Sequence, residues 1–221
     1  MIRIVFYVTL LIIYLVLAKG FAPSETNYSY FADSKALAQY LELEYPANVI
    51  LIDMNTKGEF VKTYFHKYRV FVLDQYKDVE VRTSPLFFNK SARYLGMSLF
   101  QFTSEKQSND IPSPSGVGFI GNEILGEWRI NKAGKRYWQF YQFDSNYYDL
   151  LGWNQVATEE YYEKINSHQS LEKPYKGINK EFGLNGVATQ KHFPKFYARL
   201  KSKLTKKQIL KKYIDKNLRL K

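Results

Sequence analysis

The residue types most able to move protons or hold metal ions are sparse in this chain. Its three histidines, His66, His168 and His192, lack the His-x-His or His-x3-His spacing of metal sites. Each is expected to be an ordinary surface or partly buried side chain. The absence of Cys excludes thiolate catalysis, Cys-ligated zinc and iron–sulfur clusters. We therefore predict no metal site and no cofactor.

Carboxylates offer two further kinds of chemistry, and neither has a distinctive pattern. A nuclease could place a divalent ion on Asp74 and Glu80, although acidic residues at strand ends are common. Glycoside hydrolysis needs two carboxyl groups about 5 to 9 Å apart, which spacing alone does not reveal. No Gly-x-Ser-x-Gly elbow or phosphate-binding Gly-x4-Gly-Lys loop occurs. No catalytic residue is predicted, and the glycosidase candidates are Glu42, Glu44, Asp53, Glu123, Glu127 and Asp144.

An aromatic block is the strongest candidate for ligand contact. All three tryptophans fall within 26 residues, interleaved with several Tyr and Phe residues. Exposed rings of this kind stack on sugars, whereas buried rings supply much of a small domain's apolar area. Core packing is the more common of the two roles. The candidate ligand-binding residues are Trp128, Trp138, Tyr141 and Trp153.

Positive charge is concentrated at the C-terminal end. The net charge is +11, and residues 191–221 contain twelve Lys or Arg and one acid, so the other residues are neutral overall. From Thr205 onward the apolar residues follow a helical period, which predicts an amphipathic helix. Such a tail suits an anionic membrane surface, an envelope polymer or an acidic protein. The candidate contacts are Lys201, Lys203, Lys206, Lys207, Lys211 and Lys212.

The N-terminal segment predicts export. Arg3 precedes a run from Ile4 to Ala18 in which Thr9 is the only polar side chain apart from two tyrosines. A positive residue followed by an apolar run is typical of a secretory signal, and cleavage after Ala18 is expected. Fifteen residues are short for a transmembrane helix, so an inner-membrane anchor formed by residues 4–18 is the alternative. A periplasmic or extracellular location argues against nucleic acid as a partner.

The elements that would position these residues indicate an α+β fold, with a small mixed or antiparallel sheet and packed helices. A helix is expected over 33–45 and a buried strand over 48–53. Strands over 68–73 and 78–82 are expected to join through a turn at 75–77. We predict the following organisation: 1–22 as signal or anchor, 24–104 as an α/β region, 105–117 as a linker, 118–190 as an aromatic-rich region and 191–221 as a basic tail.

The second half is harder to interpret. Residues 127–130 read as a strand and 131–134 as a tight turn. Tyr137, Tyr141, Tyr148 and Leu151 share a helical face, which favours a helix over 137–151. Residues 164–192 have no clear period and are expected to form loops.

Short Gly-rich and aromatic motifs recur in the second half of the chain, at Gly118–Asn122, Gly126–Arg129, Tyr137–Tyr141, Leu150–Gly152, Phe182–Gly186 and His192–Tyr197. They resemble uncharacterised exported bacterial proteins that carry a Gly/Trp/aromatic segment. The resemblance covers about a third of the chain and implies export, with no activity, cofactor or site to transfer. A non-enzymatic envelope binding or structural module is therefore the leading hypothesis, and a hydrolase of envelope polysaccharide or peptidoglycan is the alternative.

Overall fold

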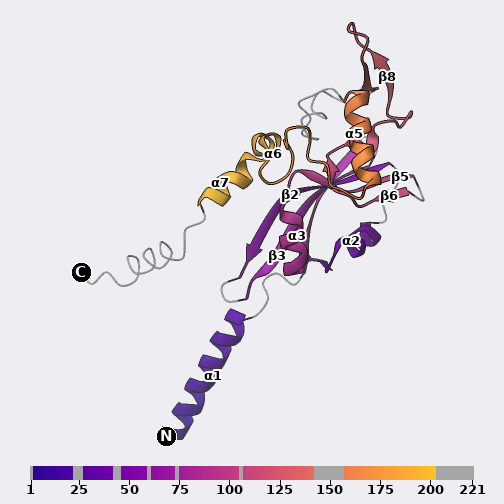
Figure 1. Cartoon of the computed structure of the whole chain (residues 1–221). Coiled ribbons are helices and arrows are strands. Elements are labelled where there is room, and N and C mark those ends of the chain that lie inside the picture. Colours follow the sequence, from indigo (N-terminus) through magenta and orange to yellow (C-terminus); the bar gives the residue numbers. More distant parts are fainter. Residues whose placement is uncertain are drawn as a thin grey trace.

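A mixed β-sheet forms the centre of this α+β protein, as the computed structural model shows (Figure 1). The structure describes residues 2–21, 27–41, 46–58, 61–72, 75–104, 107–141 and 157–202. The strand order is β1-β4-β3-β2-β5-β6, and β7 also pairs with β5. Among the described strands of this sheet, only β1 and β4 run parallel. The strands are β1 (Tyr30–Phe31), β2 (Ala47–Lys57), β3 (Thr63–Val72), β4 (Gln75–Thr83), β5 (Met97–Ser104), β6 (Gln107–Asn109) and β7 (Ser113–Pro114).

The position of β2 between β3 and β5 explains the continuous apolar run in its sequence. Both faces of the sheet are covered, so the successive side chains from Ala47 to Ile52 are all buried. Val49 and Leu51 join one buried cluster, whereas Ile50 and Ile52 join the other. The expected strand over 48–53 is confirmed and is longer than predicted. Both expected strands of the β3–β4 pair are also present, but residues 75–77 lie within β4 rather than in a turn.

Two short helices cover the first face of the sheet. In α2 (Ser34–Leu41), Asp33 Oδ1 accepts a hydrogen bond from the Ala36 backbone N–H at 3.0 Å, and Leu37 is fully buried. In α3 (Pro85–Ala92), the N-cap Ser84 Oγ accepts from the Phe87 N–H at 3.0 Å. Such caps satisfy backbone donors that the first helical turn leaves without partners.

The second face is covered by segments from the second half of the chain. They are the 3-10 helix η1 (Val117–Phe119), the hairpin β8 (Gly126–Ile130) and β9 (Arg136–Phe140), and α5 (Glu159–Ser170). Ile50 and Phe71 share a buried cluster with Phe119, Trp138 and Ile165. The polar stretch expected to form a linker contributes β6 and β7 to the sheet.

Two expectations for this half are wrong. The aromatic residues from Tyr137 form strand β9 rather than a helix, because they pair with β8 and the Trp138 N–H donates to the Ala157 carbonyl at 2.8 Å. Residues 142–151 of the expected helix lie outside the described residues. The segment expected to form loops contains the end of α5, capped at its start by Thr158, and all of α6 (Val187–His192).

The helix α7 (Pro194–Ser202) packs on the body through one side. Phe196 and Tyr197 contact the buried cluster that contains Val49 and Leu51. The Tyr197 hydroxyl donates a hydrogen bond to the Leu184 carbonyl. Arg199 forms an ion pair with Asp53 of β2. The expected helix from Thr205 lies outside the described residues.

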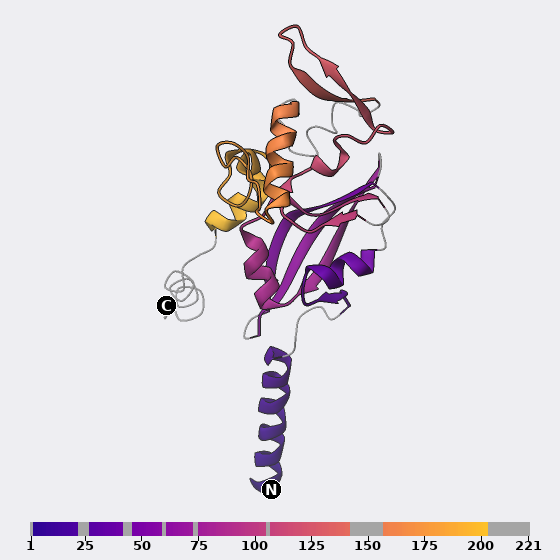
Figure 2. The ribbon, with the colours of Figure 1, turned by 45° about the vertical axis from the view of Figure 1, so that its right-hand side comes forward.

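The N-terminal helix α1 (Ile2–Phe21) projects away from the body in both views (Figures 1 and 2). Its large apolar side chains from Ile4 to Leu15 are 46–68% exposed. Among the described residues, none of the helices has both the length and the apolar character needed to cross a bilayer.

Candidate functional site

The candidate site is the aromatic hairpin β8–β9 and the helix α5 beside it. Trp128 and Trp138 stand directly opposite each other on the two strands, with ring centroids 5.3 Å apart at an interplanar angle of 73°. Trp128 also lies 5.9 Å from the Tyr162 ring of α5, and Trp138 lies 6.2 Å from the Phe140 ring. The two predicted tryptophans therefore belong to one aromatic cluster.

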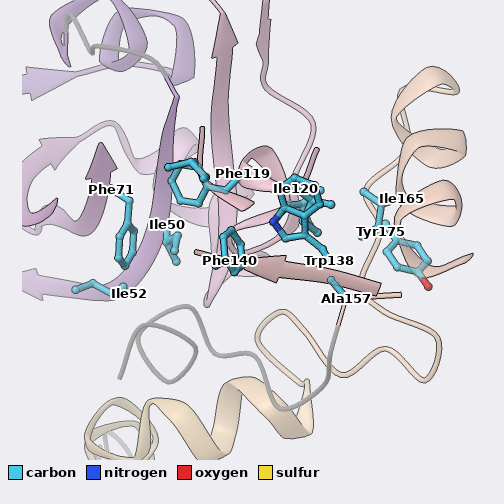
Figure 3. Close-up of a cluster of buried hydrophobic side chains, with 12 residues drawn as sticks. Ile50, Ile52, Phe71, Phe119, Ile120, Trp138, Phe140, Ala157, Ile165 and Tyr175 are labelled. Atoms are coloured by element: carbon cyan, nitrogen blue, oxygen red, sulfur yellow. The ribbon is translucent and has the colours of Figure 1, made fainter. Parts of the chain in front are cut away.

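The inner face of this hairpin is part of the hydrophobic core. Trp138 is only 3% exposed. Figure 3 shows Trp138 and Phe140 between Ile50 and Phe71 of the main sheet on one side and Ile165 of α5 and Tyr175 on the other. The indole Nε1 of Trp138 is buried and has no hydrogen-bond partner among the described atoms. Trp138 therefore packs as a core residue and offers no ring face to a ligand.

Trp128 is half-buried at the edge of the same cluster. The Arg136 guanidinium carbon lies 5.5 Å from its ring centroid, and Arg136 also forms an ion pair with Glu159 at the start of α5. A cation over an indole ring and a carboxylate beside that cation hold the three groups together. Trp128 therefore joins the hairpin to α5.

The outer face of the hairpin carries polar and aromatic side chains. Strand alternation places Glu127, Arg129, Tyr137 and Gln139 opposite the tryptophan face. Arg129 Nε donates to Glu127 Oε1 at 2.5 Å, and the Tyr137 hydroxyl donates to Gln139 Oε1 at 3.3 Å. Tyr141, directly after β9, is 54% exposed. Of the predicted ligand-binding residues, Tyr141 is thus accessible, whereas Trp153 lies outside the described residues.

Several of the candidate acids and histidines that the structure describes have separate partners, and Glu42, Glu44 and Asp74 lie outside the described residues. Glu127 pairs with Arg129 and Asp53 pairs with Arg199, while Asp144 lies outside the described residues. The His168 ring packs 4.7 Å from the Tyr175 ring, and its Nδ1 lies 2.8 Å from the Lys164 carbonyl. In the part of the chain that the structure describes, no three His, Cys, Asp or Glu residues are grouped to hold a metal ion.

Sequence reasoning missed a buried pair of tyrosines, Tyr161 in α5 and Tyr175 after it. Tyr161 and Tyr175 have ring centroids 5.8 Å apart, and Tyr175 is 6% exposed. Burial raises the pKa of both hydroxyls, and the negative charge of Glu181 raises each pKa further. Both phenols are therefore protonated and neutral at physiological pH. The position of Tyr175 in the sequence gave no signal, because the stretch from 164 lacked a recognisable period.

His66 is a second position that differs from expectation. It is fully buried rather than at the surface, with its Nδ1 2.7 Å from the Tyr68 hydroxyl oxygen. Burial lowers its pKa to about 3, so the ring is neutral. The shared face of His66, Tyr68 and Val70 on β3 was the signal that could have revealed this burial.

The basic surface is only partly described. Lys191, Lys195 and Lys201 are exposed on α6 and α7. Of the predicted anionic-surface contacts, Lys201 is in α7, and the other five, from Lys203 to Lys212, lie outside the described residues. Comparison of the chain with family models, curated proteins and solved structures finds no match.

Proposed function

We propose that this chain is an exported cell-envelope protein that acts as a non-enzymatic binding module, with its basic C-terminal part against an anionic surface. The carrying observation is α1, whose apolar side chains are exposed along the helix. A contiguous apolar surface of this kind marks a contact with lipid or protein. A positive residue followed by an apolar run is what the export machinery recognises.

The charge distribution supports an anionic membrane as the surface. Lys191, Lys195 and Lys201 are exposed, whereas Arg199 is neutralised by Asp53. Each Lys or Arg near anionic lipid contributes about 1 kcal/mol of attraction. A cluster of basic residues would therefore bind such a surface in a salt-dependent manner.

Vesicle binding tests the role of the basic part. The full chain and a variant ending at Ser202 are each mixed with vesicles with and without anionic lipid, at low and high salt. We expect the full chain to bind anionic vesicles and lose that binding at high salt, and the shortened variant to bind more weakly. Equal, salt-independent binding by both proteins would reject the electrostatic contact.

Location is tested separately by N-terminal sequencing of the protein from fractionated cells. A new N-terminus at Lys19 in a periplasmic or extracellular fraction would show cleaved export. An intact N-terminus in the membrane fraction would show a retained anchor. Recovery of the intact chain from the cytoplasmic fraction would reject export in both forms.

The alternative hydrolase has no observation in its favour among the described residues. Trp138 is a core residue, Glu127 is paired with Arg129, and His168 packs against Tyr175. A hydrolase of this kind requires two carboxyl groups at one cleft.

A further inference from the structure

We propose that one end of the central sheet, where β3 begins and β4 ends, is the membrane-facing surface of the body, with the anionic headgroup region of a bilayer as its occupant. We call it the basal surface, and it rests on the proposed function with α1 uncleaved and embedded in the bilayer interface through its exposed apolar side chains. Its residues are Tyr30, Val61, Lys62, Arg82 and Leu86.

Strand register brings these residues to the same end of the molecule. Tyr30 of β1 stands beside Arg82 of β4, and Tyr64 at the start of β3 stands beside Thr83. Val61 and Lys62 directly precede β3, and Leu86 follows β4 in the first turn of α3. The sheet topology thus places five residues from three separate parts of the sequence at the same end of the sheet.

The apolar members of the basal surface are exposed. Leu86 is 78% exposed, Tyr30 is 55% exposed and Val61 is 37% exposed. Next to Leu86, Phe87 is buried, so the core contact of α3 is already provided by its neighbour. Single exposed apolar residues are ordinary, but three at one end of a sheet make a patch that favours an apolar partner.

Two cationic side chains accompany this patch. Lys62 is exposed, with its Nζ donating to the Gly58 carbonyl at 2.5 Å. The Arg82 guanidinium carbon lies 5.9 Å from the Tyr30 ring centroid. Tyr, Leu and Val beside Lys and Arg suit the lipid interface, because the apolar parts enter the acyl boundary while the charges stay among phosphates.

Chain connectivity identifies the bilayer as the occupant. The helix α1 ends at Phe21, and the pairing of β1 with β4 begins at Tyr30. Nine residues extend to at most about 32 Å, so the basal surface stays within that distance of the end of α1. Figures 1 and 2 both show α1 extending from this end of the body, opposite the hairpin β8–β9. An embedded α1 therefore holds the basal surface near lipid.

The opposite end of the molecule supplies a matched control. Ile124, just before β8, is 78% exposed, the same fraction as Leu86. Because the chain has no Cys, Leu86→Cys and Ile124→Cys each create one labelling position in the full-length protein. Both variants carry the same environment-sensitive fluorophore. The probe membranes are phosphatidylcholine vesicles with and without phosphatidylglycerol, prepared with and without lipids that carry a quencher.

We expect the fluorophore at Leu86→Cys to brighten about twofold or more on anionic vesicles and to be quenched by the lipid-borne quencher, as for a group at the acyl boundary. At Ile124→Cys neither change is expected. In the unlabelled chain, Lys62→Glu should weaken binding at low salt, whereas Lys132→Glu in the hairpin turn should not.

The outcomes separate this inference from the proposed function. If the full chain fails to bind vesicles, both the proposed function and this inference are rejected. If it binds and the two fluorophores respond equally, or only Ile124→Cys responds, the basal surface is not the membrane-facing surface, and the proposed function stands. Response of Leu86→Cys only in concentrated, vesicle-free samples would indicate contact with a second copy and would also overturn the inference.

Discussion

At the scale of single residues, His66 shows how strongly burial changes a side chain. Its ring lies 5.2 Å from that of Phe87 and 5.4 Å from that of Phe88, and Nε2 has no hydrogen-bond partner among the described atoms. A protonated imidazolium in this position would lose its hydration without gaining a counter-ion, which is why burial holds the pKa at about 3.

This burial predicts a pH-dependent stability. In the unfolded chain, His66 has its ordinary pKa of about 6.5. Between pH ~6.5 and about 3 it is therefore protonated in the unfolded chain and neutral in the native state. Stability should be complete above pH ~6.5 and fall by about 1.4 kcal/mol per pH unit as the pH drops toward 3. Urea unfolding at pH 7 and pH 5 should show a smaller difference for His66→Gln than for the natural chain. His168→Gln is the control, and an equal difference in all three proteins would contradict the prediction.

The tryptophans and Tyr141 give a second prediction at this scale. Trp138→Ala removes a core side chain and should lower the free energy of unfolding by about 3–5 kcal/mol. Tyr141→Ala removes a side chain that is 54% exposed and should change it by less than about 0.5 kcal/mol. Chemical denaturation measures both changes. Similar losses in the free energy of unfolding for the two variants would show that Trp138 is not a core residue or that Tyr141 is not a surface residue.

At the scale of elements, the hairpin shows what the sequence could and could not reveal. The turn was predictable because its chemistry is local: Asn131 Oδ1 accepts from the Ala133 and Lys135 N–H groups, and Gly134 has φ of 76°. Strand β9 was not predictable, because its aromatic spacing also fits a helical face. The deciding contacts, with Trp128 across the hairpin and with Ala157, are tertiary.

The same reasoning applies to the sheet and to the candidate site. The apolar run of β2 revealed a buried strand, whereas β6 and β7 are short and polar, with no local pattern to mark them. The aromatic block was recognisable as a unit, but which rings face inward depends on the pairing of Trp128 with Trp138.

The hairpin carries a prediction that compares two glycines. A Cβ at Gly126 would lie 2.4 Å from the Gln139 carbonyl oxygen and 2.9 Å from the Trp138 ring, so Gly126→Ala should force the strands apart. At Gly134 nothing lies within 4 Å, and only the positive φ opposes Ala, with a cost of about 1 kcal/mol. Thermal unfolding should therefore show the larger loss for Gly126→Ala. A larger loss for Gly134→Ala would mean that turn conformation outweighs strand contact.

At the scale of the whole molecule, the C-terminal part divides at Ser202. A chain ending at Ser202 keeps α7, with Phe196 and Tyr197 on the core and Arg199 paired with Asp53. A chain ending at Gln190 loses all of them. We expect the first to unfold at the same temperature as the full chain and the second to unfold about 5 °C or more below it. Calorimetry on the three proteins checks this, and equal temperatures for all three would show that α7 does not stabilise the body.

The parallel pairing of β1 with β4 has a consequence for the order of folding. Tyr30 pairs with Arg82, which lies 52 positions later in the sequence, and β2 and β3 lie between them. Contacts so distant in sequence close late and slow the search for the native state. If the N-terminal end passes first through a translocation channel, β1 emerges before β4 and remains unpaired until β4 has followed. The pairs β2–β3 and β3–β4 join neighbouring strands and can form first, so the β1–β4 contact would be the last of these to close.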